Sequence, residues 1–225
     1  MKFGICNLSV VPCRKEPSDK SEMVTQLLFG EHFEILDEND MWLNIRIAYD
    51  DYHCWIDKKQ FQALDEKIVE KINTSGVYLA ADKIQLLHNY EGAMFPIVIG
   101  STLPFNSNKI CLLGDKKFLY EGNVLKNLPA EPQGNLQRQI SPNPSREKII
   151  ETAQLFLNAP YLWGGRTIFG LDCSGFTQLV FKLNGIKLKR DAHQQAEQGT
   201  TVNFADEAEQ GDLAFFDNTN GKIVH

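Results

Sequence analysis

The chain has 225 residues, of which 43% are hydrophobic and 23% are charged, and its formal net charge is −6. This composition is typical of a globular protein with one large domain or about two or three small ones. Because the sequence has no basic stripe and no arginine-rich run, we do not expect nucleic acid as a partner.

Five cysteines are scattered along the chain and never form a Cys-x-x-Cys pair. An odd, scattered set indicates neither a disulfide framework nor a zinc site. We expect the first four to be small buried hydrophobic residues in a reducing compartment. The five are Cys6, Cys13, Cys54, Cys111 and Cys173.

The first residues do not predict an export signal. Asn7 and Ser9 interrupt the early apolar stretch, and no small-x-small cleavage site follows it. No apolar run approaches the length of a transmembrane helix. We therefore expect a cytoplasmic protein without membrane contact. The alternative is a periplasmic or extracellular protein whose export signal is missing from this sequence.

Residues 1–63 are predicted to form a small all-β module. Apolar and polar residues alternate over residues 31–36, 42–47 and 52–56, which is the pattern of half-buried strands. Gly30 interrupts this pattern where a small barrel needs a tight turn.

A second small β barrel is predicted over residues 74–128, where short apolar runs are separated by glycine-containing turns. Residues 64–73 are either a short connecting helix or an irregular linker. Four of the nine prolines fall within residues 129–144, which predicts an extended, semi-rigid linker and a domain boundary.

The remaining residues, 145–225, change in character and predict an α+β domain. Ser145 is a suitable cap for a helix that runs to about residue 157. Asp172 is a natural cap for a second helix, in which apolar residues recur at helical spacing up to a stop signal at residues 184–185. Two strands are expected afterwards, at residues 213–216 and 222–225.

The second helix places Cys173 in its first turn. Unpaired backbone N–H groups and the helix dipole favour a thiolate there, and a thiolate attacks carbonyl carbon. Cys173 is therefore a candidate nucleophile, with a buried structural cysteine as the competing interpretation. His225 is the candidate base, while His193 lies in a polar run and fits a surface or the rim of a site.

Five ordered blocks carry a resemblance to a known family: residues 160–165 (PYLWGG), 171–176 (LDCSGF), 190–191 (RD), 211–216 (GDLAFF) and 223–225 (IVH). Together they resemble the NlpC-type papain-like cysteine peptidases of bacterial cell-wall metabolism. The resemblance implies Cys173 as the nucleophile and His225 as the base. It also places Tyr161 beside the catalytic centre.

The upstream half adds to this resemblance. Two bacterial SH3-like barrels before such a domain resemble the γ-D-glutamyl-L-diamino acid endopeptidases, in which the first barrel closes one side of the cleft. The resemblance implies that acidic groups capture the substrate amine, with Asp191 as the first candidate. Asp172 and Ser174, on either side of the nucleophile, and Glu16 and Tyr52 of the first barrel are further candidates for substrate binding.

The predicted fold is therefore α+β, with two small SH3-like barrels (residues 1–63 and 74–128), a linker (129–144) and a papain-like catalytic domain (145–225). In the resembled family the residue that orients the histidine lies beyond it, so we expect the third catalytic residue beyond His225 and the domain to be incomplete. We expect Trp163 and Phe176 to be core residues.

The predicted substrate is a murein peptide with a free N-terminal L-alanine, cut between γ-D-glutamate and the diamino acid. A peptidase that remodels polymeric cell wall is one alternative, and a catalytically impaired murein-binding protein is another. No metal, organic cofactor or obligate protein partner is expected.

Overall fold

The N-terminal module is a single antiparallel sheet of seven strands. The computed structural model describes residues 2–89, 91–104, 109–114, 116–127 and 144–225. The strands are β1 (Lys2–Ile5), β2 (Val10–Arg14), β3 (Met23–Leu28), β4 (His32–Glu38), β5 (Trp42–Ile47), β6 (His53–Asp57) and β7 (Gln62–Leu64), in the spatial order β3-β2-β6-β5-β4-β1-β7. Alternate residues point inward, as the sequence pattern predicts, and surround a core that includes Val11, Leu27, Phe33 and Ile45.

A helix connects this module to a second group of strands. It is α1 (Glu66–Thr74), capped by the Asp65 carboxylate, which accepts a hydrogen bond from the Lys67 N–H at 2.9 Å. Of the two structures predicted for this stretch, the helix is therefore right. The strands that follow are β8 (Val77–Ala80), β9 (Ile84–Asn89), β10 (Met94–Val98), β11 (Ile110–Leu113), β12 (Lys116–Tyr120) and β13 (Val124–Asn127), paired as β10-β9-β12-β11 and β13-β8.

A second hydrophobic core joins the two β modules, because Ile5, Phe29 and Leu64 of the first module belong to the same buried cluster as Leu87 and Leu113 of the second. The ring of Phe29 from the first module packs against Phe95 and Phe118 of the second, with centroids 5.7 and 5.9 Å apart. Gly30 has φ +76°, and a β-carbon there would lie 1.9 Å from the Thr102 carbonyl oxygen. Only glycine therefore allows the turn after β3 to approach the second module this closely.

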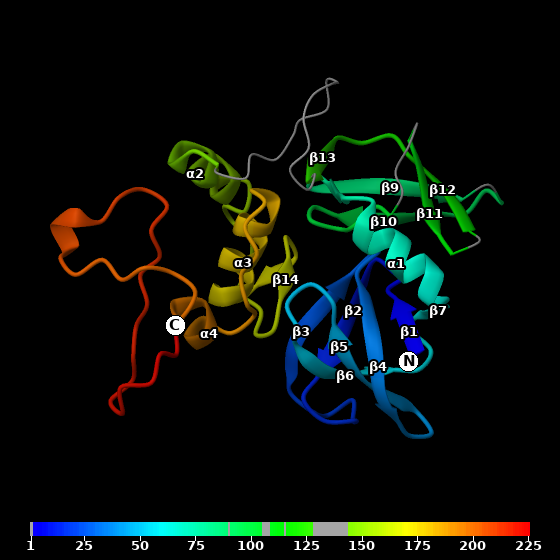
Figure 1. The fold of residues 1–225 in the computed structure, drawn as a ribbon, viewed down its shortest axis with the longest axis horizontal. Coiled ribbons are helices and arrows are strands. Elements are labelled where there is room, and N and C mark those ends of the chain that lie inside the picture. Colours follow the sequence, from blue (N-terminus) through cyan, green and yellow to red (C-terminus); the bar gives the residue numbers. More distant parts are fainter. Residues whose placement is uncertain (1, 90, 105–108, 115, 128–143) are drawn as a thin grey trace.

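The C-terminal part contains most of the helices and lies beside the two stacked β modules (Figure 1). Its elements are α2 (Arg146–Gln154), β14 (Arg166–Thr167), β15 (Gly170–Leu171), α3 (Cys173–Leu183), α4 (Ala192–Ala196) and the 3₁₀ helix η1 (Ala205–Glu207). Both predicted caps are present: Ser145 accepts from the Lys148 N–H, and Asp172 accepts from the Gly175 N–H. Apolar residues of α2 and α3 pack against Leu79 and Ile99 of the second module.

The prediction of two regular strands near the C-terminal end of the sequence is wrong. Residues 213–216 and 222–225 form an irregular hairpin with a single bridge between Asp217 and Ile223. Phe216 is 59% exposed and Val224 is 53% exposed. Among the described residues no further strand pairs with this hairpin, and an isolated two-stranded pair is marginal without a partner or a buried face.

The predicted proline-rich linker, residues 129–144, lies outside the described residues except for Pro144. The described parts on either side of it, β13 and α2, contribute to one hydrophobic cluster, in which Leu125 packs against buried residues that include Ile149.

A buried cluster of charges joins all three parts of the chain. The Glu31 carboxylate accepts two hydrogen bonds from the Arg166 guanidinium, both at 3.0 Å, and one from the Lys182 ammonium at 2.7 Å. Lys182 also donates to the Gly100 carbonyl of the second β module at 2.9 Å. Burial alone would raise the pKa of Glu31, but the two cations outweigh it and lower the pKa to about 2.

We predict that Glu31→Gln destabilises the protein by about 3 kcal/mol at neutral pH, because it leaves two cations buried without a counter-charge. The folded-state pKa of Glu31 is below its ordinary value of 4.5, so its stabilisation is complete above that pH and is lost as the pH falls towards 2. Urea unfolding at several pH values should therefore show less loss of stability between pH 4.5 and 2 in the variant. The exposed Glu38→Gln is the control, and an equal effect from both variants would contradict the prediction.

Candidate active site

The start of α3 is held by the residue before it. Asp172 is buried, and its carboxylate accepts hydrogen bonds from the Gly175 N–H at 2.7 Å and the Gly164 N–H at 2.9 Å. The neighbouring loop packs tightly on the helix, since a β-carbon on Gly175 would lie 2.2 Å from the Gly165 carbonyl oxygen. This packing fixes Cys173 in the first turn, next to backbone N–H groups that have no partner within the helix.

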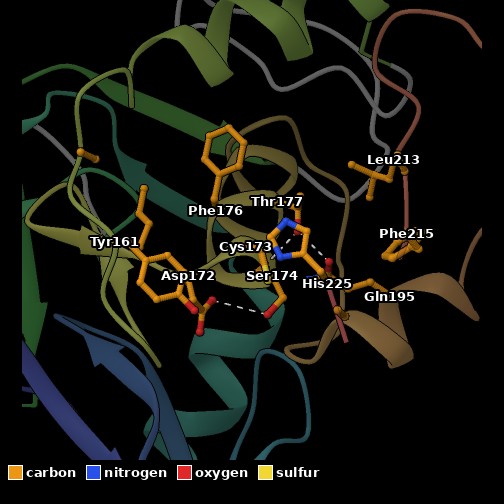
Figure 2. Close-up of a pocket in the computed structure, with 14 residues that line it drawn as sticks. Tyr161, Asp172, Cys173, Ser174, Phe176, Thr177, Gln195, Leu213, Phe215 and His225 are labelled. Atoms are coloured by element: carbon orange, nitrogen blue, oxygen red, sulfur yellow. Dashed lines mark hydrogen bonds between the residues drawn. The ribbon is translucent and has the colours of Figure 1, made fainter. Parts of the chain in front are cut away.

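Cys173 opens onto a cavity of about 340 Å³. Figure 2 shows Cys173, Tyr161 and His225 around this cavity, with Leu213 and Phe215 on its far side. The lining residues are Ala159, Tyr161, Leu171, Asp172, Cys173, Ser174, Phe176, Thr177, Ala192, Gln195, Leu213, Ala214, Phe215 and His225. The cavity is therefore mostly apolar, with one thiol and one imidazole on its wall.

His225 reaches the cavity from the C-terminal hairpin. Its carbonyl accepts from the Phe216 N–H at 2.9 Å, and its ring lies 5.9 Å from the Phe216 ring. Arg146 at the start of α2 holds the preceding turn through bonds to the Gln210 carbonyl and the Asp212 carboxylate. In the described part of the chain no hydrogen bond joins Cys173 directly to His225. Such contacts are often long before substrate binds.

Tyr161 lies on the side of Cys173 away from His225 (Figure 2), and it is 67% exposed. Its backbone bridges to Leu171, immediately before the cap of α3. Partial burial, together with the nearby Asp172 and Cys173, raises the pKa of the Tyr161 hydroxyl. At neutral pH the hydroxyl is therefore protonated and can donate a hydrogen bond towards the cavity.

The structure brings Tyr52 and Asp191 together. The Tyr52 hydroxyl, from the first β module, donates to the Asp191 carboxylate at 3.2 Å, although 139 residues separate them in sequence. Burial and the Asp191 charge raise the pKa of Tyr52, so it remains a donor. Asp191 immediately precedes Ala192, which lines the cavity.

Glu16 does not take part in this arrangement. It is exposed in the loop between β2 and β3, where its backbone N–H bonds to Ser21. No contact between Glu16 and the cavity or Asp191 is present among the described residues.

Asp172 and Ser174 line the cavity, but their side chains are already engaged. Arg190 donates to the Asp172 carboxylate at 2.6 Å and to the Ser174 hydroxyl at 2.8 Å. Their polar atoms therefore hold the start of α3 in place. Arg190 is a buried residue of this site that the local sequence pattern did not single out, and the only signal available was an arginine next to Asp191 in an ordered block.

The sequence predicts Trp163 and Phe176 to be core residues, and the structure differs for Trp163. Trp163 is not a core residue: it is 59% exposed, and its indole N–H donates to Glu22 of the first β module at 2.8 Å. An indole with a polar partner is stable at a surface between modules. Phe176 is half-buried against Phe156 and also lines the cavity.

The described residues contain no group of three or more His, Cys, Asp or Glu side chains that could hold a metal ion. None of the helices in the described ranges is long and apolar enough to cross a bilayer.

Residues 158–225 match the NlpC/P60 family, and residues 13–61 match the bacterial dipeptidyl-peptidase Sh3 domain. The chain carries an NlpC/P60 domain. The α+β fold prediction, with SH3-like modules before a papain-like domain, is confirmed by these matches and by a crystal structure of an NlpC/P60 family protein from Bacillus cereus ATCC 10987. That structure aligns with a TM-score of 0.82 at 22% identity, over 99% of this chain and 86% of the other.

Two curated relatives are similar over nearly the whole sequence. The gamma-D-glutamyl-L-lysine dipeptidyl-peptidase of Bacillus cereus (strain ATCC 10987) is 27% identical over 91% of this chain. The protein of the same name from Bacillus subtilis (strain 168) is 28% identical over 98%. The chain spans 63% and 69% of the lengths of these two relatives.

The difference in burial among the five cysteines predicts that an alkylating reagent reacts selectively with Cys173. Cys6, Cys13, Cys54 and Cys111 are at most 2% exposed, and burial raises the pKa of Cys111 to about 12. Cys173 is partly exposed at a helix start. We predict that iodoacetamide at neutral pH adds one group to the native protein, at Cys173, and none to Cys173→Ala. Peptide mass mapping checks this, and faster labelling of any other cysteine would contradict it.

Proposed function

We propose that this protein is a cysteine peptidase that hydrolyses the γ-D-glutamyl–diamino acid bond of murein peptides with a free N-terminal L-alanine. The observation that carries this proposal is the Tyr52–Asp191 contact. It joins a hydroxyl of the first β module to a carboxylate of the C-terminal domain, next to the Cys173 cavity. The names of the two Bacillus relatives support the same bond type.

In the proposed reaction, the Cys173 thiolate attacks the γ-carbonyl carbon of D-glutamate and forms a C–S bond. The carbonyl oxygen becomes an oxyanion, which the backbone N–H of Cys173 and the Tyr161 hydroxyl are placed to stabilise. Protonated His225 gives its proton to the departing amine of the diamino acid as the C–N bond breaks. This step leaves a thioester on Cys173.

Hydrolysis of the thioester completes the cycle. His225, now neutral, takes a proton from water, and the hydroxide attacks the thioester carbon. The C–S bond then breaks, which releases the L-Ala-γ-D-Glu dipeptide and restores the thiolate and protonated His225.

Selection for a free N-terminus follows from the position of Asp191. A partly buried carboxylate is stabilised by a substrate ammonium, whereas an acylated N-terminus would leave it without a partner and place an amide against it. Peptides already released from the wall have such an amine, and peptides still attached to glycan through L-alanine do not. The enzyme would therefore act on released peptides.

The test compares L-Ala-γ-D-Glu-L-Lys with its N-acetylated form. We expect kcat/KM for the free peptide to be higher by about 100-fold or more. Cys173→Ala should abolish cleavage. Asp191→Asn should remove most of the preference without unfolding the protein, because asparagine also caps α4. Asp206→Asn, an exposed carboxylate in η1, is the matched control and should behave as wild type.

The remaining outcomes distinguish the alternatives. Equal cleavage of both peptides would contradict the free-amine requirement and favour an enzyme that remodels polymeric wall. Binding without cleavage of either peptide would favour a non-catalytic murein-binding protein.

A further inference from the structure

Arg190 connects the first β module to the start of the nucleophile helix. Its side chain is 1% exposed, and its Nε donates to the Thr25 hydroxyl of β3 at 3.0 Å. The other two guanidinium nitrogens donate to Ser174 and Asp172, the residues on either side of Cys173. One planar group therefore reaches two modules and both neighbours of the thiol.

The geometry leaves Asp172 little freedom. Oδ1 of its carboxylate accepts the Gly175 N–H of the first helical turn, while Oδ2 accepts the Gly164 N–H and the Arg190 guanidinium. In a buried environment such charge-assisted bonds are strong and directional. The orientation of this carboxylate sets where the first turn of α3 begins, and Cys173 belongs to that turn.

Thr25 in turn holds the guanidinium. Thr25 is fully buried in β3, and its hydroxyl is the partner of Nε. Without the hydroxyl, Nε would be a buried donor with no acceptor, and the guanidinium would be free to tilt. A lysine at position 190 could not replace this arrangement, because an ammonium lacks the planar fork that reaches three acceptors.

We propose that Thr25 and Arg190 are positioning residues, through which the docked first β module holds Cys173 in its reactive orientation. This inference rests on the proposed function, and it extends the role of the first module from the substrate amine to the nucleophile.

Lys189 provides a matched comparison. It is next to Arg190 in sequence and also bonds to the first module, with its ammonium 2.9 Å from the Asp50 carbonyl and 3.1 Å from the Asp51 carboxylate. Its side chain does not contact Asp172 or Ser174. Lys189→Met therefore removes a contact between the modules without touching the start of α3.

The experiment uses the full chain with Thr25→Val, Thr25→Ser, Arg190→Lys and Lys189→Met. For each variant, kcat and KM are measured on L-Ala-γ-D-Glu-L-Lys, Cys173 alkylation is followed with iodoacetamide, and melting is recorded. We expect Thr25→Val and Arg190→Lys to lower kcat by about tenfold to a hundredfold with KM almost unchanged, since small misplacement of a reacting group costs this much. Alkylation of Cys173 should slow in the same two variants.

Thr25→Ser retains the hydroxyl and should restore wild-type kcat, and Lys189→Met should leave it unchanged. Wild-type kcat and alkylation in Thr25→Val and Arg190→Lys would overturn the inference. So would losses in Lys189→Met as large as those in Thr25→Val at equal melting temperature, because they would indicate loose docking alone. If wild type does not cleave the peptide, the proposed function fails, while the alkylation rates of the variants still test the positioning role.

Discussion

The carboxylate of Glu31 is the point on which the arrangement of the three modules depends. It lies at the turn after β3, it is buried, and it holds Arg166 and Lys182 from the C-terminal domain. Burial lowers the pKa of Lys182, and the nearby negative charge of Glu31 reduces this lowering without cancelling it. A triad of this kind stabilises the fold little relative to a hydrophobic core, but it makes wrong docking costly, because any displacement exposes uncompensated charges to a low-dielectric interior. Lys182 also reaches the Gly100 carbonyl, so the same cluster aligns the second β module.

With the modules aligned in this way, the site is composite. The candidate nucleophile Cys173, the candidate base His225 and the apolar cavity belong to the NlpC/P60 domain, while Tyr52 and Thr25 come from the first β module. The first module therefore contributes contacts beside the cavity: the Tyr52 hydroxyl bonds to Asp191, and Thr25 bonds to Arg190, which in turn bonds to the residues on either side of Cys173. In the proposed function, this arrangement relates specificity to docking, because the interface that aligns the modules also brings Tyr52 to Asp191, the proposed partner of the substrate amine.

The parts of the fold that depend on local chemistry could be predicted from the sequence. Ser145 and Asp172 cap their helices as expected, and the alternating residues of the first module form strands. The failures arise from long-range pairing. Glu31 and Arg166 are 135 residues apart in sequence, and no local sequence pattern predicts that they pair. The apolar residues at 213–216 have the composition of a strand but not its regular pairing, and the surface position of Trp163 depends on Glu22, 141 residues away.

The most direct test is a crystal structure of the Cys173→Ala protein with L-Ala-γ-D-Glu-L-Lys bound. The ammonium of the peptide should lie within about 3.2 Å of the Asp191 carboxylate, beside the Tyr52 hydroxyl, with the γ-amide carbonyl carbon over residue 173. A peptide whose amine faces solvent, or whose γ-amide lies outside the cavity between Tyr161 and His225, would contradict the composite site.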